Sequence, residues 1–319
     1  MKVRLCAVFA LAAALTSACS DDPEPFRPPD IDSAAVSTDY DPDLEPSAAA
    51  LALVPAEATV LEVTDFDQLR LVLGFGSLDG DSPADERRKF WAAAEGAAML
   101  SDGLLRPDDE RLRREYGFGQ DDVAWEAHYG VGETTDWVIA FHEDVRMDDV
   151  RRAATYGVGP LDDVEIDTQR RLVSSEPLPD GDETWAADAA LHDLVGDPAA
   201  STYVETDCLP FDTVFGDGMQ AQLAAAPAAE LSMLDPIEGF SVAFGGELVT
   251  VRLGPDREDA FERMRIADVM PRTDPEFGVA FARGVADPSG GRIGYDLARP
   301  ASAVELTEGR HLPFAVCAD

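Results

Sequence analysis

Residues 58–65 have the sequence ATVLEVTD, and residues 201–207 have the similar sequence STYVETD. Each stretch is a short run of β-branched and aliphatic residues that ends near an aspartate, which is typical of a β-strand. A helical stretch follows in both places and ends at Gly74 or Gly216, because glycine commonly terminates helices. The paired openings predict a diverged tandem duplication, and chance matching of common elements is the alternative.

The rest of the chain supports this division. The order hairpin, helix, hairpin, helix, strand occurs twice, and the turn at Gly245-Gly246 is a strong hairpin signal. The predicted fold class is therefore α+β, with two diverged tandem repeats over 54–200 and 201–319 packed as antiparallel sheets with helices. The expected strands are 59–63, 123–129, 137–141, 164–166, 171–173, 202–204, 240–244, 248–253, 277–285, 291–297 and 312–316. The expected helices are 67–73, one from Pro83, one from Pro107, 147–156, 183–195, 257–266 and 301–306.

The composition limits the classes of partner. The 319 residues are 45% hydrophobic, enough to bury a substantial core, and carry a formal net charge of -38. Such a charge repels nucleic acid phosphates and anionic lipid head groups, so neither is an expected direct partner. The acidic residues are spread along the chain, which favours a general role in solubility over recognition of a specific cationic ligand.

The N-terminus has the pattern of an export signal. Lys2 and Arg4 precede an apolar run from Leu5 to Leu15, which is shorter than the roughly 20 residues of a membrane-spanning helix. Small residues then lead to Cys19. This arrangement resembles the signal peptide of bacterial lipoproteins, in which the cysteine becomes the lipidated first residue of the mature protein.

The resemblance implies a signal peptide over 1–18 and a lipid, including palmitate, on Cys19. It places the protein at the extracytoplasmic face of the cell membrane, with the lipid as its contact with the membrane. The family usually has leucine three residues before the cysteine, where this chain has Thr16. Ordinary secretory cleavage after Ala18, without lipidation, is therefore the alternative.

The number of cysteines is consistent with lipidation. Cys6 leaves with the signal peptide, so the mature chain keeps Cys19, Cys208 and Cys317. Lipidation of Cys19 would leave one pair in a compartment where disulfides form. We expect Cys208 and Cys317 to form a stabilising disulfide, and two separate buried thiols are the alternative.

Residues 19–53 are predicted to be a lipidated N-terminus and a disordered tether. The segment is acidic and rich in proline, as in Ser20–Pro25 and Arg27–Asp30. Such a segment buries too little apolar surface to offset its ordering entropy. We expect it to hold the folded part away from the membrane.

Motifs of catalysis, cofactor binding or metal binding are weak in this sequence, so no catalytic, cofactor or metal residue is assigned. There is no Gly-x-Ser-x-Gly and no Walker loop. Two Gly-x-Gly stretches, at Gly117 and Gly157, are better explained as helix ends than as phosphate sites. Asp79-Gly80-Asp81 is better explained as a solvated turn than as a calcium loop. The scattered histidines are His128, His142, His192 and His311, and the aromatic residues of the first hairpin, expected in the core or along a groove, are Trp125, Tyr129, Trp137 and Phe141.

Three functional classes remain open. The favoured class is a non-enzymatic binding or envelope-associated module with an unidentified protein or small-molecule partner. The alternatives are a hydrolase that uses paired carboxylates on envelope glycans and a cation-dependent surface module. The mature part resembles uncharacterised actinobacterial lipoproteins in the segments Asp122–Tyr129, Gly157–Asp162 and Gly284–Tyr295, and these families imply no activity.

Overall fold

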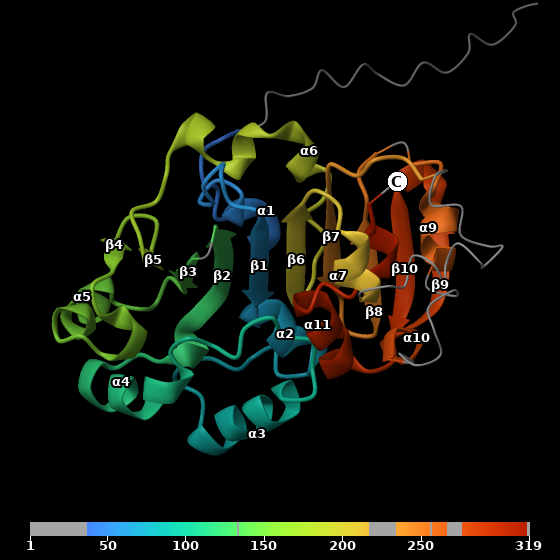
Figure 1. Ribbon diagram of the computed structural model, residues 1–319. Helices are drawn as coiled ribbons and strands as arrows, with labels where there is room; N and C mark the ends of the chain where they lie inside the picture. Colours follow the sequence, from blue (N-terminus) through green and yellow to red (C-terminus); the bar gives the residue numbers. More distant parts are fainter. Residues whose placement is uncertain (1–36, 133, 217–233, 256, 267–275, 318–319) are drawn as a thin grey trace, which may run out of the picture. The chain divides into compact units, whose positions relative to one another are not determined.

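The computed structural model describes residues 37–132, 134–216, 234–255, 257–266 and 276–317. Their strands form one ten-stranded antiparallel sheet in the order β4-β5-β3-β2-β1-β6-β7-β8-β10-β9 (Figure 1). The α+β class is therefore confirmed. The strands are β1 (Val60–Asp65), β2 (Val123–Val131), β3 (Thr134–Phe141), β4 (Glu165–Asp167), β5 (Leu172–Ser174), β6 (Ser201–Thr206), β7 (Gly239–Phe244), β8 (Leu248–Arg252), β9 (Phe281–Asp287) and β10 (Arg292–Leu297).

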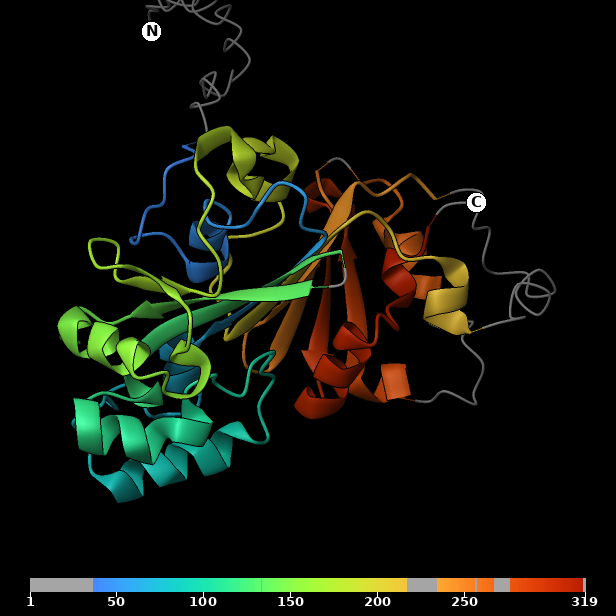
Figure 2. The same ribbon diagram turned by 60° about the vertical axis from the view of Figure 1, so that its left-hand side comes forward.

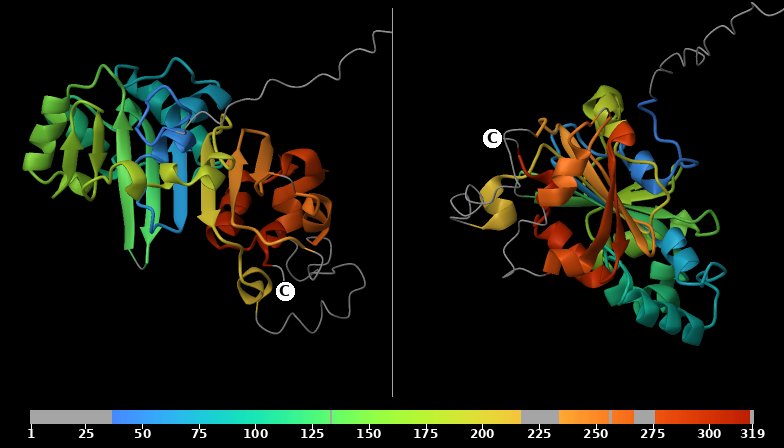
Figure 3. Two further views of the ribbon diagram at one scale, coloured as in Figure 1. Left: turned by 90° about the horizontal axis from the view of Figure 1, so that it is seen from above. Right: turned by 90° about the vertical axis from the view of Figure 1, so that its right-hand side faces the viewer.

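The two similar openings of the sequence lie side by side at the centre of the sheet. They form β1 and β6, and Leu61 is directly opposite Val204. Four strands, β2 to β5, lie beyond β1 on one side and four, β7 to β10, lie beyond β6 on the other (Figure 3, left). The sheet is therefore continuous across both predicted repeats.

Helices cover the two faces of the sheet unequally. One face, which we call the α1 face, packs against α1 and the segment that contains α6 (Figure 2). The opposite face packs against α2 to α5 in the first half and against α7 and α9 to α11 in the second. The helices are α1 (Pro46–Ala50), α2 (Phe66–Val72), α3 (Ala84–Ala94), α4 (Asp109–Tyr116), α5 (Met147–Thr155), α6 (Ala189–His192), α7 (Phe211–Phe215), α9 (Ala260–Ile266), α10 (Glu276–Ala280) and α11 (Pro300–Glu308).

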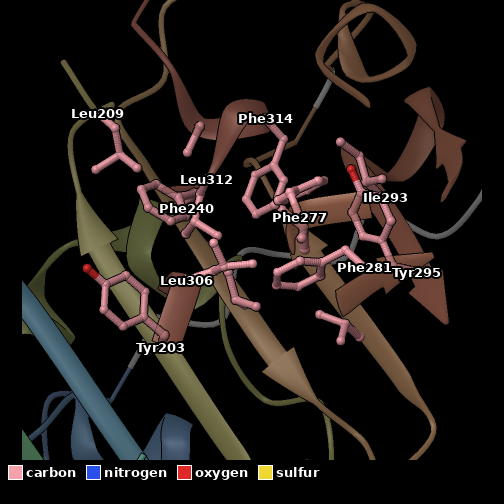
Figure 4. Packing of buried hydrophobic residues seen from close by; sticks show 14 of the residues in the cluster. Tyr203, Leu209, Phe240, Phe277, Phe281, Ile293, Tyr295, Leu306, Leu312 and Phe314 are labelled. Carbon is pink, nitrogen blue, oxygen red and sulfur yellow. The ribbon is translucent and has the colours of Figure 1, made fainter. Parts of the chain in front are cut away.

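The core is built from alternating strand residues. Leu61, Val63 and Val204 face α1 and Trp185, whereas Tyr203 faces the opposite side of the sheet, as the period of two requires. On that side an aromatic cluster fills the second half (Figure 4). Its rings are in contact: Phe277 and Phe281 are stacked with 4.8 Å between their ring centroids, and Phe277–Tyr295 and Phe281–Phe314 are edge-on pairs.

Helix ends follow the local sequence signals. Asp65 ends β1 and caps α2, because its Oδ1 accepts a hydrogen bond from the Gln68 N–H at 2.9 Å. Gly117 ends α4 at φ 83° and Gly157 follows α5 at φ 58°. Both Gly-x-Gly stretches therefore form helix ends, as the sequence predicts.

The predicted tether is wrong at its C-terminal end. Residues 1–36 lie outside the described residues, but Pro46–Ala50 form α1, and Ala49 to Val54 are buried with exposed fractions of at most 7%. The apolar run Leu51-Ala52-Leu53-Val54 explains this burial, because it packs against β1 and Trp185. The folded part therefore includes these residues.

Three other expectations are corrected. The helix expected over 183–195 is replaced by two 3₁₀ turns and α6, since Asp188 caps a new helix by accepting from the Ala190 N–H. The strand expected over 277–285 begins at Phe281, after α10. The strand expected over 312–316 is a 3₁₀ turn over Pro313–Ala315, because proline has no N–H for a sheet ladder.

Cys208 and Cys317 are paired in a disulfide, as the cysteine count predicts, with their Cα atoms 4.9 Å apart. Backbone hydrogen bonds flank the bond, from Leu209 N to Ala315 O and from Cys317 N to Leu209 O. The disulfide thus holds the C-terminal segment against the end of β6. It closes a loop with a sequence separation of 109 residues.

Replacing both Cys208 and Cys317 by alanine should lower the free energy of unfolding. In the chain-entropy model a loop of this length contributes roughly 4 to 5 kcal/mol, as an upper figure. Urea denaturation of the oxidised protein and the double variant measures the difference. Quantitative alkylation of both thiols in native exported protein, without reductant, would contradict the pairing.

Candidate functional site

The histidines and the acidic turn form no common site. His142 Nε2 lies 3.0 Å from Asp67, His192 contacts the carbonyl of Ala186, and His311 contacts that of Val214. The carbonyl of Gly80 accepts hydrogen bonds from Arg87 at 2.8 Å and from Arg113 at 2.9 Å. The turn at Asp79–Asp81 is therefore tied to arginines.

A groove of about 520 Å³ lies where β1 and β3 end and β2 begins. Its walls come from the segment Tyr40–Pro46, from Trp125 and Phe141 on the hairpin, and from Arg170 and Arg171 between β4 and β5. Its volume is in the range of small-molecule sites. We call it the end groove. Part of the aromatic set of the first hairpin therefore lines a groove as well as the core.

Asp65 is the most buried charged residue of the end groove, with 8% of its surface exposed. Burial raises the pKa of its carboxyl group to about 7, against the opposing effect of the backbone N–H of Gln68. Shifted pKa values of this kind concentrate at functional sites. The helix cap thus places a proton-binding carboxyl group in the groove.

Three other charged groups of the groove, Asp67, Arg170 and Arg171, have partners. Arg170 Nε lies 2.6 Å from Asp167, and Arg171 donates to the carbonyl groups of His142, at 3.0 Å from its Nε, and of Val145. Asp67 contacts Arg70 at 2.6 Å and His142 at 3.0 Å. Although burial opposes the effect, these two contacts hold the pKa of Asp67 below its usual value.

A second group of carboxylates lies on the opposite face of the sheet, on the central strands. We call Glu62, Glu126 and Glu205 the central carboxylates. Glu126 is fully buried and accepts from Ser101 Oγ at 2.6 Å, from Gln120 Nε2 at 2.9 Å and from the backbone N–H of Leu104. Its two oxygens therefore tie the α3–α4 connection to β2.

Glu205 is also satisfied by protein groups. Its Oε2 accepts from the Tyr203 hydroxyl at 2.6 Å, and its Oε1 pairs with Arg310. Glu62 differs, because it accepts no hydrogen bond from any described residue. A two-carboxylate hydrolase needs an acid and an ionised partner that both reach the substrate, and the central carboxylates offer only Glu62.

Across the described ranges, no group of three or more His, Cys, Asp or Glu residues could hold a metal ion. None of the described helices is long and apolar enough to cross a membrane. Comparison of the chain with protein-family models, curated proteins and solved structures found no match.

Most of the end groove is not predicted from the sequence. The predicted tether includes Tyr40 and Glu45, and the sequence places Asp65 only at the end of a strand. The signal that could have identified the wall is the apolar run at 51–54, which predicts that the preceding residues lie against the folded part. Of the predicted site residues, Cys208 and Cys317 are brought together, whereas Cys19 lies outside the described residues.

Replacing Glu62 by glutamine should make the protein more stable above neutral pH. Burial, reinforced by the nearby Glu308 carboxylate, raises the pKa of Glu62 from 4.5 to about 7. The folded state therefore binds this proton more tightly than the unfolded state, so the contribution of Glu62 to the free energy of unfolding falls as pH rises from 4.5 to 7.

We expect the glutamine variant to gain up to roughly 3 kcal/mol at pH 8 and nothing below pH 4.5. Urea denaturation across this pH range measures the gain. The exposed Glu57 provides the control, since Glu57→Gln should leave the profile unchanged. If the free energies of unfolding of the wild type and of Glu62→Gln changed with pH in parallel, the raised pKa of Glu62 would be contradicted.

Proposed function

We propose that this chain is an extracytoplasmic lipoprotein, anchored to the cell membrane through a lipid on Cys19, whose folded part binds a ligand without reacting it. The observation that carries the anchor is the Cys208–Cys317 disulfide. After removal of the signal peptide, Cys19 is the one cysteine of the mature chain that lies outside this disulfide. A lipid at this position accounts for that cysteine.

The end groove supports the binding part of the proposal. It has a volume of about 520 Å³, within the range of small-molecule sites, and its lining combines three aromatic side chains with seven charged groups. The best-placed carboxylates of the opposite face, Glu126 and Glu205, are held by protein donors. These contacts favour binding over carboxylate-based hydrolysis.

We further propose that the two halves arose by tandem duplication. From the central pair outward, the strand order is β1-β2-β3-β5-β4 on one side and β6-β7-β8-β10-β9 on the other. Leu61 pairs with Val204, and the same offset aligns Glu62 with Glu205 and Pro55-Ala56 with Pro198-Ala199. The residue offset that aligns the two halves in sequence is therefore the same as the offset between the paired residues Leu61 and Val204.

Replacing Cys19 by alanine should move the protein out of the membrane fraction or block its maturation. Two or more acyl chains give stable membrane attachment, and the variant has no sulfur to carry them. Fractionation and intact-mass measurement in a lipid-processing bacterium test this. The matched control is Cys6→Ala, because Cys6 leaves with the signal peptide. Wild-type protein that is entirely soluble, at its unlipidated mass, would contradict the anchor.

A ligand should raise the melting temperature of the folded part without being consumed. Stabilisation follows from mass action for any ligand that binds only the native state. A thermal-shift screen against cell-wall fragments, lipids and divalent ions measures it. Release of product from a glycan, abolished when one carboxylate is changed to its amide, would overturn the non-enzymatic proposal.

A further inference from the structure

The end groove has an excess of unpaired negative charge. Asp43, Glu45 and Glu143 line it and make no ion pair with any residue that the structure describes. Its two cations are already engaged, Arg170 with Asp167 and Arg171 with backbone carbonyl groups. A cation that entered the groove would therefore meet carboxylates that lack a counter-charge.

Aromatic residues also line the groove together with Asp65, its most buried carboxyl group. Tyr40 and Trp125 contribute to the same lining as Asp65. Aromatic faces attract organic cations, and the attraction grows when water is displaced. Alkyl groups next to the charge would also gain from contact with Phe141 and Ala140, which line the groove as well.

We propose that the end groove binds a small alkylammonium ligand, with its ammonium group at Asp65 and its alkyl chain against the aromatic wall. The inference rests on the proposed binding function and specifies its ligand class. An organic cation is favoured over a metal ion because no group of three ligating side chains is present in the described part of the chain.

Binding should be linked to a proton. The Asp65 carboxyl group lies among titratable and charged groups from every wall of the groove: Tyr40, Asp43 and Glu45 before α1, Asp67 on α2, Glu143 after β3, and Arg170 and Arg171 between β4 and β5. Burial raises its pKa to about 7, so part of the population is protonated at neutral pH. An ammonium group stabilises the ionised form. Affinity should therefore rise as pH increases from 6 to 8.

The test is isothermal titration calorimetry on the full-length protein, purified in a non-ionic detergent, with 1,4-diaminobutane as the probe. The neutral control is 1,4-butanediol, which has the same chain length and no charge. We expect the diamine to bind and the diol not to bind. Asp65→Asn should weaken diamine binding at least about tenfold and abolish its pH dependence, while asparagine still caps α2.

The matched control variant is Asp188→Asn, which changes another aspartate that caps a helix, α6, outside the end groove. It should bind the diamine as wild type does. No diamine binding by folded wild-type protein, or equal weakening in both variants, would overturn the inference. If the diamine does not bind but a different ligand raises the melting temperature in the thermal-shift screen, only the ligand class is rejected and the proposed binding function stands.

Discussion

The antiparallel pairing of β1 with β6 makes one sheet out of two five-stranded halves. The pairing buries polar side chains in the middle of the molecule, where each needs a partner. Thr64 Oγ1 and Ser201 Oγ lie 3.3 Å apart, and they accept from the backbone N–H groups of Ser101, at 3.0 Å, and Leu100, at 3.3 Å. The loop after α3 is thereby fixed across both halves. The end groove depends on the same strand, because Asp65 is the last residue of β1.

A buried arginine binds the C-terminal segment to α9 in the second half of the molecule. Arg263 on α9 donates to the carbonyl groups of Phe314 at 3.0 Å and Val316 at 2.9 Å, and to Asp259 at 2.7 Å. A buried guanidinium is tolerated only when its donors are satisfied, and here two of its partners belong to the C-terminal segment. Arg263 and the disulfide therefore hold the same segment, and Phe314 of that segment belongs to the aromatic cluster.

The sequence predicted the parts of this fold that depend on neighbouring residues. The hairpins at 123–141 and 240–253 and the helix that ends near Gly74 follow from short-range signals, and the structure has them. The errors lie where distant contacts override local preference. Phe277 is the first residue of a predicted strand, but it lies in α10 and its ring packs against Tyr295 and Phe314 in the aromatic cluster. Trp185 donates to the Ala58 carbonyl in place of continuing a helix. The end groove could not be predicted, because its walls meet only after the sheet has formed.

Hydrogen–deuterium exchange of the full-length protein, at increasing urea below the unfolding transition, tests the role of the β1–β6 pair most directly. If the two halves form one cooperative unit, the amides of β1 and β6 exchange only by global unfolding, and more slowly than those of the edge strands β4 and β9. Independent exchange of residues 60–174 and 201–297 at different urea concentrations, with early loss of protection in β1 and β6, would contradict this account.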